Sequence, residues 1–226
     1  MVSFKGAQYP KDVILFAAFF YVRYGVSYRD LEEIMGESGV QVDHTTLNRW
    51  VIRYSGAITK TARRRKGQCD RSWRMDETYI KVKGVWVYLY RAVDKHGKTL
   101  DFMPSQRRNK SAATKFFVRM LEANDLPRKI VTDKGGSNTA GIKGINKMLK
   151  GFGCPISIEM VRRKYFNNIV EQDHRFIKRL TRPTLGFKSL ASASATLEGI
   201  EVAHMIRKGQ FTPGLCPFHQ FAELAT

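Results

Sequence analysis

The sequence predicts an α/β protein in which an all-α domain precedes a domain built on a mixed sheet. Apolar residues recur with helical spacing over the first third of the chain, and β-prone runs replace this pattern from residue 71 onward. A basic run at residues 60–66 separates the two patterns. We therefore expect residues 1–66 to form a helical domain with a basic linker, and residues 67–226 to form the α/β domain.

Three helices are expected in the first domain. Pro10 suits the first turn of a helix that carries the apolar run at residues 13–22 and ends before Gly25. Ser27 and Asp30 have the spacing of a capping box at the start of a short second helix. Asp43 can cap a third helix, because an apolar stripe follows it with helical spacing. The members of this stripe are Leu47, Trp50, Val51 and Tyr54.

The second and third helices, joined by a turn that contains glycine, indicate a helix-turn-helix. The apolar stripe leaves hydrogen-bonding and basic side chains on the outer face of the third helix. Such a face suits the reading of base edges in DNA. The alternative is a plain helical bundle whose outer face is only solvated. The candidate DNA-reading residues are Thr45, Thr46, Asn48, Arg49 and Arg53.

The basic run at residues 60–66 has the sequence KTARRRK and is followed by Gly67. A run of like charges is commonly a solvated linker. Here we also expect Arg63, Arg64 and Arg65 to contact DNA phosphates, because each such contact releases counterions and strengthens binding.

The strands and helices of the second domain follow one another in an order that is typical of one fold. Three β-prone runs come first, with Gly84 at the first turn, and helical stripes then alternate with short strand-like runs. The order βββαβαβα is that of the ribonuclease H-like fold. The expected strands are residues 72–82, 85–93, 99–103, 129–132 and 156–161, and the expected helices are residues 112–121, 138–150 and one from about Tyr165.

The charge of the chain points to a polyanionic partner. Its 226 residues include 39 Lys and Arg against 20 Asp and Glu, a formal net charge of +19. Nucleic acid is the expected partner of so basic a protein. A basic membrane-surface protein is the alternative, but no basic amphipathic helix supports it. The apolar run at residues 13–22 is too short to span a bilayer, so we expect no membrane partner and a cytoplasmic location.

Two acidic residues occupy positions that a sheet would bring together. Asp76 lies inside the first expected strand, where an acidic residue is unfavourable. Asp133 follows the strand at residues 129–132, at the carboxyl end where α/β sites usually lie. By itself, Asp133 is typical of a turn. Two ionised carboxylates at short range repel each other, so a site that holds both needs a cation such as Mg²⁺ or Mn²⁺.

The last expected helix offers a third acid, Glu171. At about 100° per residue, Glu171 falls opposite the apolar side and shares its face with Arg175 and Lys178. A solvated charged face is the alternative, although this arrangement also suits an edge where a metal meets a DNA backbone. Asp173 falls within the apolar arc, either as a buried hydrogen-bonding carboxylate or as a competitor for the metal. The apolar side consists of Ile169, Phe176, Ile177 and Leu180.

The residues for other known ways of cutting and rejoining DNA are missing from this sequence. The five histidines include no His-x-His pair, so a tyrosine nuclease of the single-strand type would lack its metal ligands, and the chain has no GxxxxGK[ST] loop for ATP. The expected chemistry is direct attack on phosphorus by water or a 3′ hydroxyl.

Five blocks of the sequence form a distinctive series. They are MDETYIKVKG (75–84), VTDKG (131–135), NNIVEQDHRFIKR (167–179), TLGFKS (184–189) and GIEVAHMIRKGQ (199–210). These blocks resemble the insertion-sequence-6 family of bacterial DDE transposases. The resemblance covers nearly the whole chain and includes the helix-turn-helix, whereas the segment at residues 134–140 departs from the family pattern.

The resemblance implies that Asp76, Asp133 and Glu171 are the catalytic triad and the metal ligands. Lys178 is then the basic residue seven positions after the glutamate, and it would position backbone phosphates together with Arg175. The implied activity is cleavage and strand transfer at the terminal inverted repeats of an element, in replicative transposition, by at least a dimer. Two alternatives are an inactive or domesticated DNA-binding regulator of the same fold and a structure-directed nuclease.

Overall fold

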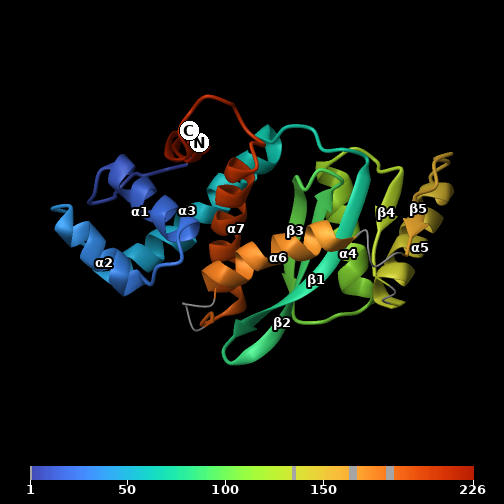
Figure 1. The fold of residues 1–226 in the computed structure, drawn as a ribbon, viewed down its shortest axis with the longest axis horizontal. Coiled ribbons are helices and arrows are strands. Elements are labelled where there is room, and N and C mark those ends of the chain that lie inside the picture. Colours follow the sequence, from blue (N-terminus) through green and yellow to red (C-terminus); the bar gives the residue numbers. More distant parts are fainter. Residues whose placement is uncertain (1, 134–135, 163–166, 182–185) are drawn as a thin grey trace. The chain divides into compact units, whose positions relative to one another are not determined.

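The computed structural model describes residues 2–133, 136–162, 167–181 and 186–226 (Figure 1). The chain divides into two compact units, one of residues 1–67 and 177–226 and one of residues 68–176. Within the described ranges, no helix is long and apolar enough to cross a membrane.

The second unit is built on a five-stranded mixed sheet with the strand order β3-β2-β1-β4-β5. β1 pairs antiparallel with β2, and β2 with β3, whereas β4 runs parallel to β1 and β5 parallel to β4. This order, with these directions, is that of a ribonuclease H-like sheet and confirms the predicted fold class. The strands are β1 (Ser72–Val82), β2 (Val85–Asp94), β3 (Thr99–Ser105), β4 (Lys129–Val131) and β5 (Glu159–Val161).

The helices that follow the strands are α4 (Lys110–Ala123), α5 (Gly136–Gly151) and α6 (Asn168–Thr181). Strand β5 is shorter than the predicted range of residues 156–161. The side chain of Asn146 donates to the Ile158 carbonyl at 3.0 Å and accepts from its N–H at 2.9 Å. The backbone groups of Ile158 therefore bond to a side chain and not to a neighbouring strand. The predicted helix start at Tyr165 lies outside the described residues.

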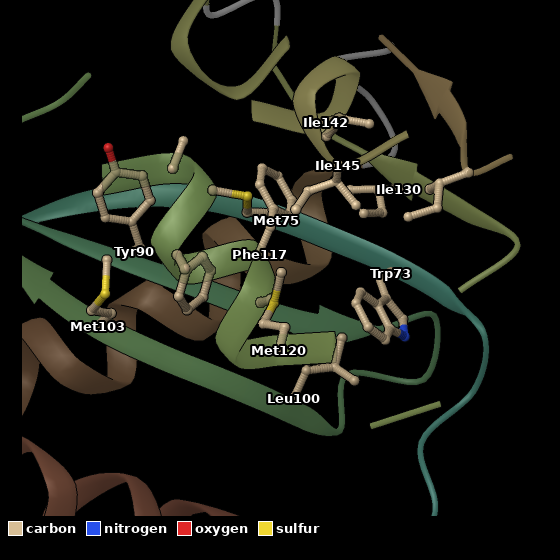
Figure 2. Close-up of a cluster of buried hydrophobic side chains, with 14 residues drawn as sticks. Trp73, Met75, Tyr90, Leu100, Met103, Phe117, Met120, Ile130, Ile142 and Ile145 are labelled. Atoms are coloured by element: carbon tan, nitrogen blue, oxygen red, sulfur yellow. The ribbon is translucent and has the colours of Figure 1, made fainter. Parts of the chain in front are cut away.

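One hydrophobic cluster joins the sheet to α4 and α5. Phe117 and Met120 of α4 lie in it with Trp73 and Met75 of β1, all of them buried (Figure 2). Burying an apolar side chain of this size contributes about 1.5–3 kcal/mol. Gly141 lets α5 approach α4 closely, because a Cβ at this position would lie 3.1 Å from the Phe117 ring.

The first unit contains the three predicted N-terminal helices, and both predicted side-chain caps are present. Ser27 and Asp30 form the capping box of α2, and the Asp43 carboxylate accepts the N–H groups of Thr45 and Thr46 at the start of α3. Pro10 is the N-cap of α1 and not part of its first turn. The helices are α1 (Lys11–Arg23), α2 (Tyr28–Glu37) and α3 (His44–Arg65).

The prediction of a linker at residues 60–66 is wrong, because α3 continues to Arg65. Ile58, Thr59 and Ala62 are buried, so the apolar side of α3 extends beyond Tyr54. Arginines in the last turn also interact favourably with the negative end of the helix dipole. The basic run is therefore the end of a helix.

The sequence does not predict α7 (Leu190–Arg207) and α8 (Pro217–Glu223). Helix α7 is buried on nearly all sides, so it has no periodic apolar stripe to reveal it. Gly199 permits its close packing, because a Cβ there would lie 2.6 Å from Ser55 Oγ and 2.7 Å from Val22 Cγ1. Residues 177–226 consequently group with the N-terminal helices, whereas the sequence assigns them to the α/β domain.

Candidate active site

The sheet brings Asp76 and Asp133 together at one end. Asp76 lies within β1, and β4 runs parallel to β1 with Val131 beside Arg74, two residues before each acid. Ligand oxygens of Asp76, Asp133 and a third acid, Glu77, all lie within 4.8 Å of one another, and the three residues are at least partly buried. The predicted meeting of Asp76 and Asp133 is therefore present in the structure.

Glu77 is the residue of this cluster that sequence reasoning misses. Successive strand residues point to opposite faces of a sheet, so a residue beside Asp76 is not an obvious partner for it. The Glu77 side chain is only 4% exposed. Burial raises its pKa, whereas the charge of Arg108 and a hydrogen bond from Asn138 lower it. The available signal is a second acid inside a β-prone run.

Arg108, in the loop between β3 and α4, bridges two of these acids. Its guanidinium lies 3.4 Å from Glu77 Oε1, through Nε, and 3.1 Å from Asp133 Oδ2, through Nη2. Asn138, at the start of α5, donates to Asp133 Oδ1 at 3.4 Å and to Thr132 Oγ1 at 3.2 Å. A cationic side chain thus already compensates part of the negative charge at this sheet end.

The electrostatics of Asp76 reflect the crowding of acids. Its pKa is raised to about 7, mainly by burial and also by the charges of Glu77, Asp133 and Glu171, while a backbone hydrogen bond from Glu77 acts in the opposite direction. His174, which lies in α6, also approaches Asp76, with its Nδ1 3.8 Å from Asp76 Oδ2. A carboxyl in this setting loses its proton more readily when a cation is close.

Helix α6 presents Glu171 much as predicted. Glu171, Arg175 and Lys178 are exposed. Glu171 is not one of the three clustered acids, but its charge acts on Asp76. On the apolar side, Phe176, Ile177 and Leu180 are buried, whereas Ile169 is 37% exposed and was wrongly assigned to that side. Val170 and His174 are also buried, so the buried side of α6 is centred away from Ile169.

Asp173 is a buried hydrogen-bonding carboxylate, one of its two predicted roles. Its Oδ2 accepts from Arg91 Nη2 at 2.8 Å, and the two side chains are 9% and 1% exposed. Arg91 is the direct cross-strand neighbour of Asp76. Asn167, just before α6, also donates to the Met75 carbonyl at 3.4 Å. These contacts hold the first turns of α6 against the strand that carries Asp76.

The predicted DNA-reading face of α3 is polar and accessible, although part of it is engaged locally. The hydroxyls of Thr45 and Thr46 bond to the Asp43 carboxylate, and Arg49 Nη2 donates to Thr46 Oγ1 at 2.8 Å. Arg53 lies over the ring of Tyr54. Thr46, Asn48 and Arg63 are half-buried, and the exposed members are Thr45, Arg49, Arg53, Arg64 and Arg65.

A ribonuclease H-like sheet that gathers carboxylates from its first strand and from the end of its fourth defines a class. Its members are metal-dependent enzymes that cleave or transfer polynucleotide strands. The profile of a family described as DDE domain matches residues 70–210. The chain belongs to the insertion-sequence-6 family of DDE transposases. Membership implies a divalent metal and DNA as partner.

Relatives match along nearly the whole chain. The transposase for insertion sequence-like element IS431mec of Staphylococcus aureus strain Mu50 is 38% identical over 227 residues, 98% of each chain. The transposase for insertion sequence element IS257 in transposon Tn4003 of the same species is 37% identical with the same coverage. Among solved structures, the HTLV-2 integrase catalytic core domain in complex with magnesium has a TM-score of 0.48 at 15% identity. It covers 70% of this chain and 99% of that domain.

Proposed function

We propose that Asp76, Asp133 and Glu171 form the catalytic triad of this transposase. The observation that carries the proposal is the meeting of Asp76 and Asp133 from two parallel strands, with the charge of Glu171 acting on Asp76. Glu171 lies in the first turn of α6, which is tied to β2 through Asp173 and Arg91. The proposed triad thus takes one residue from β1, one from the end of β4 and one from α6.

The residues present fit a divalent cation. Carboxylate oxygens are the hard ligands that Mg²⁺ and Mn²⁺ prefer, and those of Asp76, Asp133 and the neighbouring Glu77 converge within 4.8 Å. Arg108 bridges Glu77 and Asp133, and the charges of three acids add to the effect of burial in raising the pKa of Asp76, so negative charge is concentrated at this point. Asp76, Asp133 and Glu171 would hold two Mg²⁺ ions, with Mn²⁺ as a substitute. Bound there, the ions would activate the attacking hydroxyl and stabilise the leaving 3′ oxygen.

The side chains around the triad would orient the DNA. Lys178 lies seven residues after Glu171 in α6, which returns it to nearly the same face of the helix, and Arg175 is exposed one turn after Glu171. Both would contact backbone phosphates. Arg108 would compensate Glu77 and Asp133 until the cation binds, and it would keep the buried charge of Glu77 paired afterwards.

The proposed substrate is the terminal inverted repeat of an insertion element, read by the outer face of α3. Thr45, Thr46, Asn48, Arg49 and Arg53 would contact bases, and Arg63, Arg64 and Arg65 would contact phosphates. Joining donor and target in replicative transposition requires two ends at once, so the active species would be at least a dimer. Because the substrate would be bacterial DNA, the enzyme would act in the cytoplasm, on the nucleoid.

A strand-transfer assay tests the proposal. The whole chain is incubated with a labelled element end, a supercoiled target plasmid and Mg²⁺, and joined products are counted. Asp76→Asn and Asp133→Asn should each abolish joining while end binding stays within about twofold, because the DNA-reading face belongs to α3. Asp125→Asn is the matched control, since Asp125 is exposed and lies outside the cluster. End binding without any joining by the unmodified chain would favour the inactive regulator.

A further inference from the structure

The outer part of the β1–β2 hairpin carries an aromatic and basic surface that the proposed chemistry does not use. We define the hairpin face as Tyr79, Lys81, Trp86 and Tyr88. Tyr79 lies opposite Tyr88 and Lys81 opposite Trp86 in the register of the two strands. Alternate strand residues share a face, so Tyr79 and Lys81 continue the face that begins at Glu77. Figure 1 shows β1 and β2 running together to the turn that joins them.

Large aromatic surface is exposed on the hairpin face. Trp86 is 63% exposed and Tyr79 is 48% exposed. The rings of Tyr79 and Tyr88 have centroids 5.2 Å apart, and Lys81 Nζ lies 6.0 Å from the centroid of Trp86. A tryptophan that leaves most of its surface in water is unusual in a folded protein, because tryptophan is highly buried on average.

The opposite face of the same hairpin is buried, which fixes the direction of these side chains. Ile80, Val82, Val87 and Leu89 are each at most 7% exposed. A one-residue slip would exchange the two faces and expose all four. The turn supports the register, because Lys83 and Gly84 both have positive φ, of 49° and 78°, as a two-residue hairpin turn requires. The aromatic residues are therefore held outward by the packing behind them.

The charge around the hairpin face is positive. Residues 78–93 contain no Asp or Glu, and Lys81 and Lys83 are exposed. Ser105 pairs with Tyr88, so the loop that carries Arg107 and Arg108 starts beside this surface. Two copies of so basic a surface repel each other, which disfavours a second copy of this chain as the occupant.

We propose that the hairpin face binds unpaired DNA beside the cleavage point, with bases stacked on Tyr79 and Trp86 and phosphates held by Lys81 and Lys83. Exposed aromatic rings among basic side chains are the usual platform for single-stranded nucleic acid, because every base has a π-face to stack. The inference rests on the proposed function, since it takes the cleavage point to be at the carboxylates.

The position of the hairpin face sets which bases it meets. Glu77, whose carboxylate lies within 4.8 Å of that of Asp76, is on the same face as Lys81. Lys81 is four residues from Glu77 in β1, about 13 Å at 3.3 Å per residue. With the separation of the two carboxylates, this length corresponds to about five steps along a DNA strand at 3.4 Å each. Bases within about five nucleotides of the cleaved bond are thus the ones expected to stack.

The experiment compares two DNAs on the whole chain in the presence of EDTA, where no cleavage takes place. One is a blunt element end, and the other carries five unpaired flank nucleotides with 2-aminopurine as a stacking probe. Trp86→Ala should weaken binding of the flanked DNA by about five- to a hundredfold, abolish the quenching of the probe and leave the blunt end bound within about twofold. Trp86→Phe should retain most of both signals. Phe152→Ala is the matched control, because Phe152 is 83% exposed in the same unit.

Three outcomes would overturn the inference. In the first, Trp86→Ala binds both DNAs as the unmodified chain does; in the second, it loses affinity for both equally. In the third, Trp86→Ala changes from dimer to monomer in sedimentation while the quenching of the probe is unchanged, which would assign the face to a second copy. Failure of the proposed function would give a different result. In that case the flanked DNA would still stack on Trp86, but the unmodified chain would join no strands in Mg²⁺.

Discussion

The contrast between Asp173→Asn and Glu171→Gln separates a structural acid of α6 from a catalytic one. Asp173 is 9% exposed and bonds to Arg91, which is 1% exposed, at 2.8 Å. Removing one partner of a buried ion pair costs about 3–5 kcal/mol, because the other charge stays buried. Asparagine keeps a hydrogen-bond acceptor, so we expect a loss near the lower end, about 3 kcal/mol. For a chain of this size, 1 kcal/mol shifts Tm by about 2–4 °C, which gives a drop of about 6–12 °C.

Glu171→Gln should have the opposite profile. Glu171 is exposed, and surface substitutions of this kind stay within about 0.5 kcal/mol. Its negative charge also raises the pKa of Asp76, so its loss relieves repulsion and leaves Tm unchanged or slightly higher. Strand cleavage should nevertheless disappear, because a metal ligand has lost its charge.

Calorimetry and single-turnover cleavage in Mg²⁺ measure the two effects on the same preparations. Arg175→Gln serves as the control for a surface change on α6, and its Tm should stay within about 2 °C of the unmodified chain. The reasoning is refuted if Asp173→Asn keeps its Tm but cleaves no DNA while Glu171→Gln still cleaves. That pattern would make Asp173 the catalytic acid.

Two further predictions concern pH and DNA binding. In EDTA, the raised pKa of Asp76 means that the folded chain holds this proton more tightly than the unfolded chain. Its stabilising contribution is full below about pH 4 and is lost as the pH rises through about 7, by about 4 kcal/mol in total. Urea titrations from pH 4 to 8 should therefore diverge from those of Asp76→Asn, and parallel curves would contradict this. Arg49→Ala should relax sequence preference by about 1–3 kcal/mol at one base pair, whereas Arg64→Ala should weaken binding to all DNA and lower the salt slope by about one. Binding to element ends and to scrambled duplexes at several salt concentrations separates the two, and equal effects would remove Arg49 from the reading face.

Local chemistry explains what sequence reasoning predicted well. The caps at Ser27 and Asp43 depend on residues two or three positions away, so the sequence alone contains both partners. Asp76 is similarly visible, because an acid inside a β-prone run conflicts with its surroundings. The fold class followed from the succession of patterns, because the order βββαβαβα is typical of the ribonuclease H-like fold.

Long-range packing explains what the sequence did not reveal. Arg91 and Asp173 are 82 residues apart, and only the fold makes them partners. In the carboxylate cluster, Glu77 forms an ion pair with Arg108 and a hydrogen bond with Asn138, and these two residues come from other segments of the chain. Helix α7 lacks a polar face, so the periodic signal that finds surface helices is missing.

The location of bound metal tests the catalytic assignment most directly. Crystals of the whole chain grown with Mn²⁺ and an element end would reveal the ions by their anomalous scattering. The proposed triad predicts peaks coordinated by oxygens of Asp76, Asp133 and Glu171, and a Glu171→Gln crystal should lose at least one of them. Peaks held by Glu77 and Asp133 with Glu171 remote, or no peak at the carboxylates, would contradict the assignment.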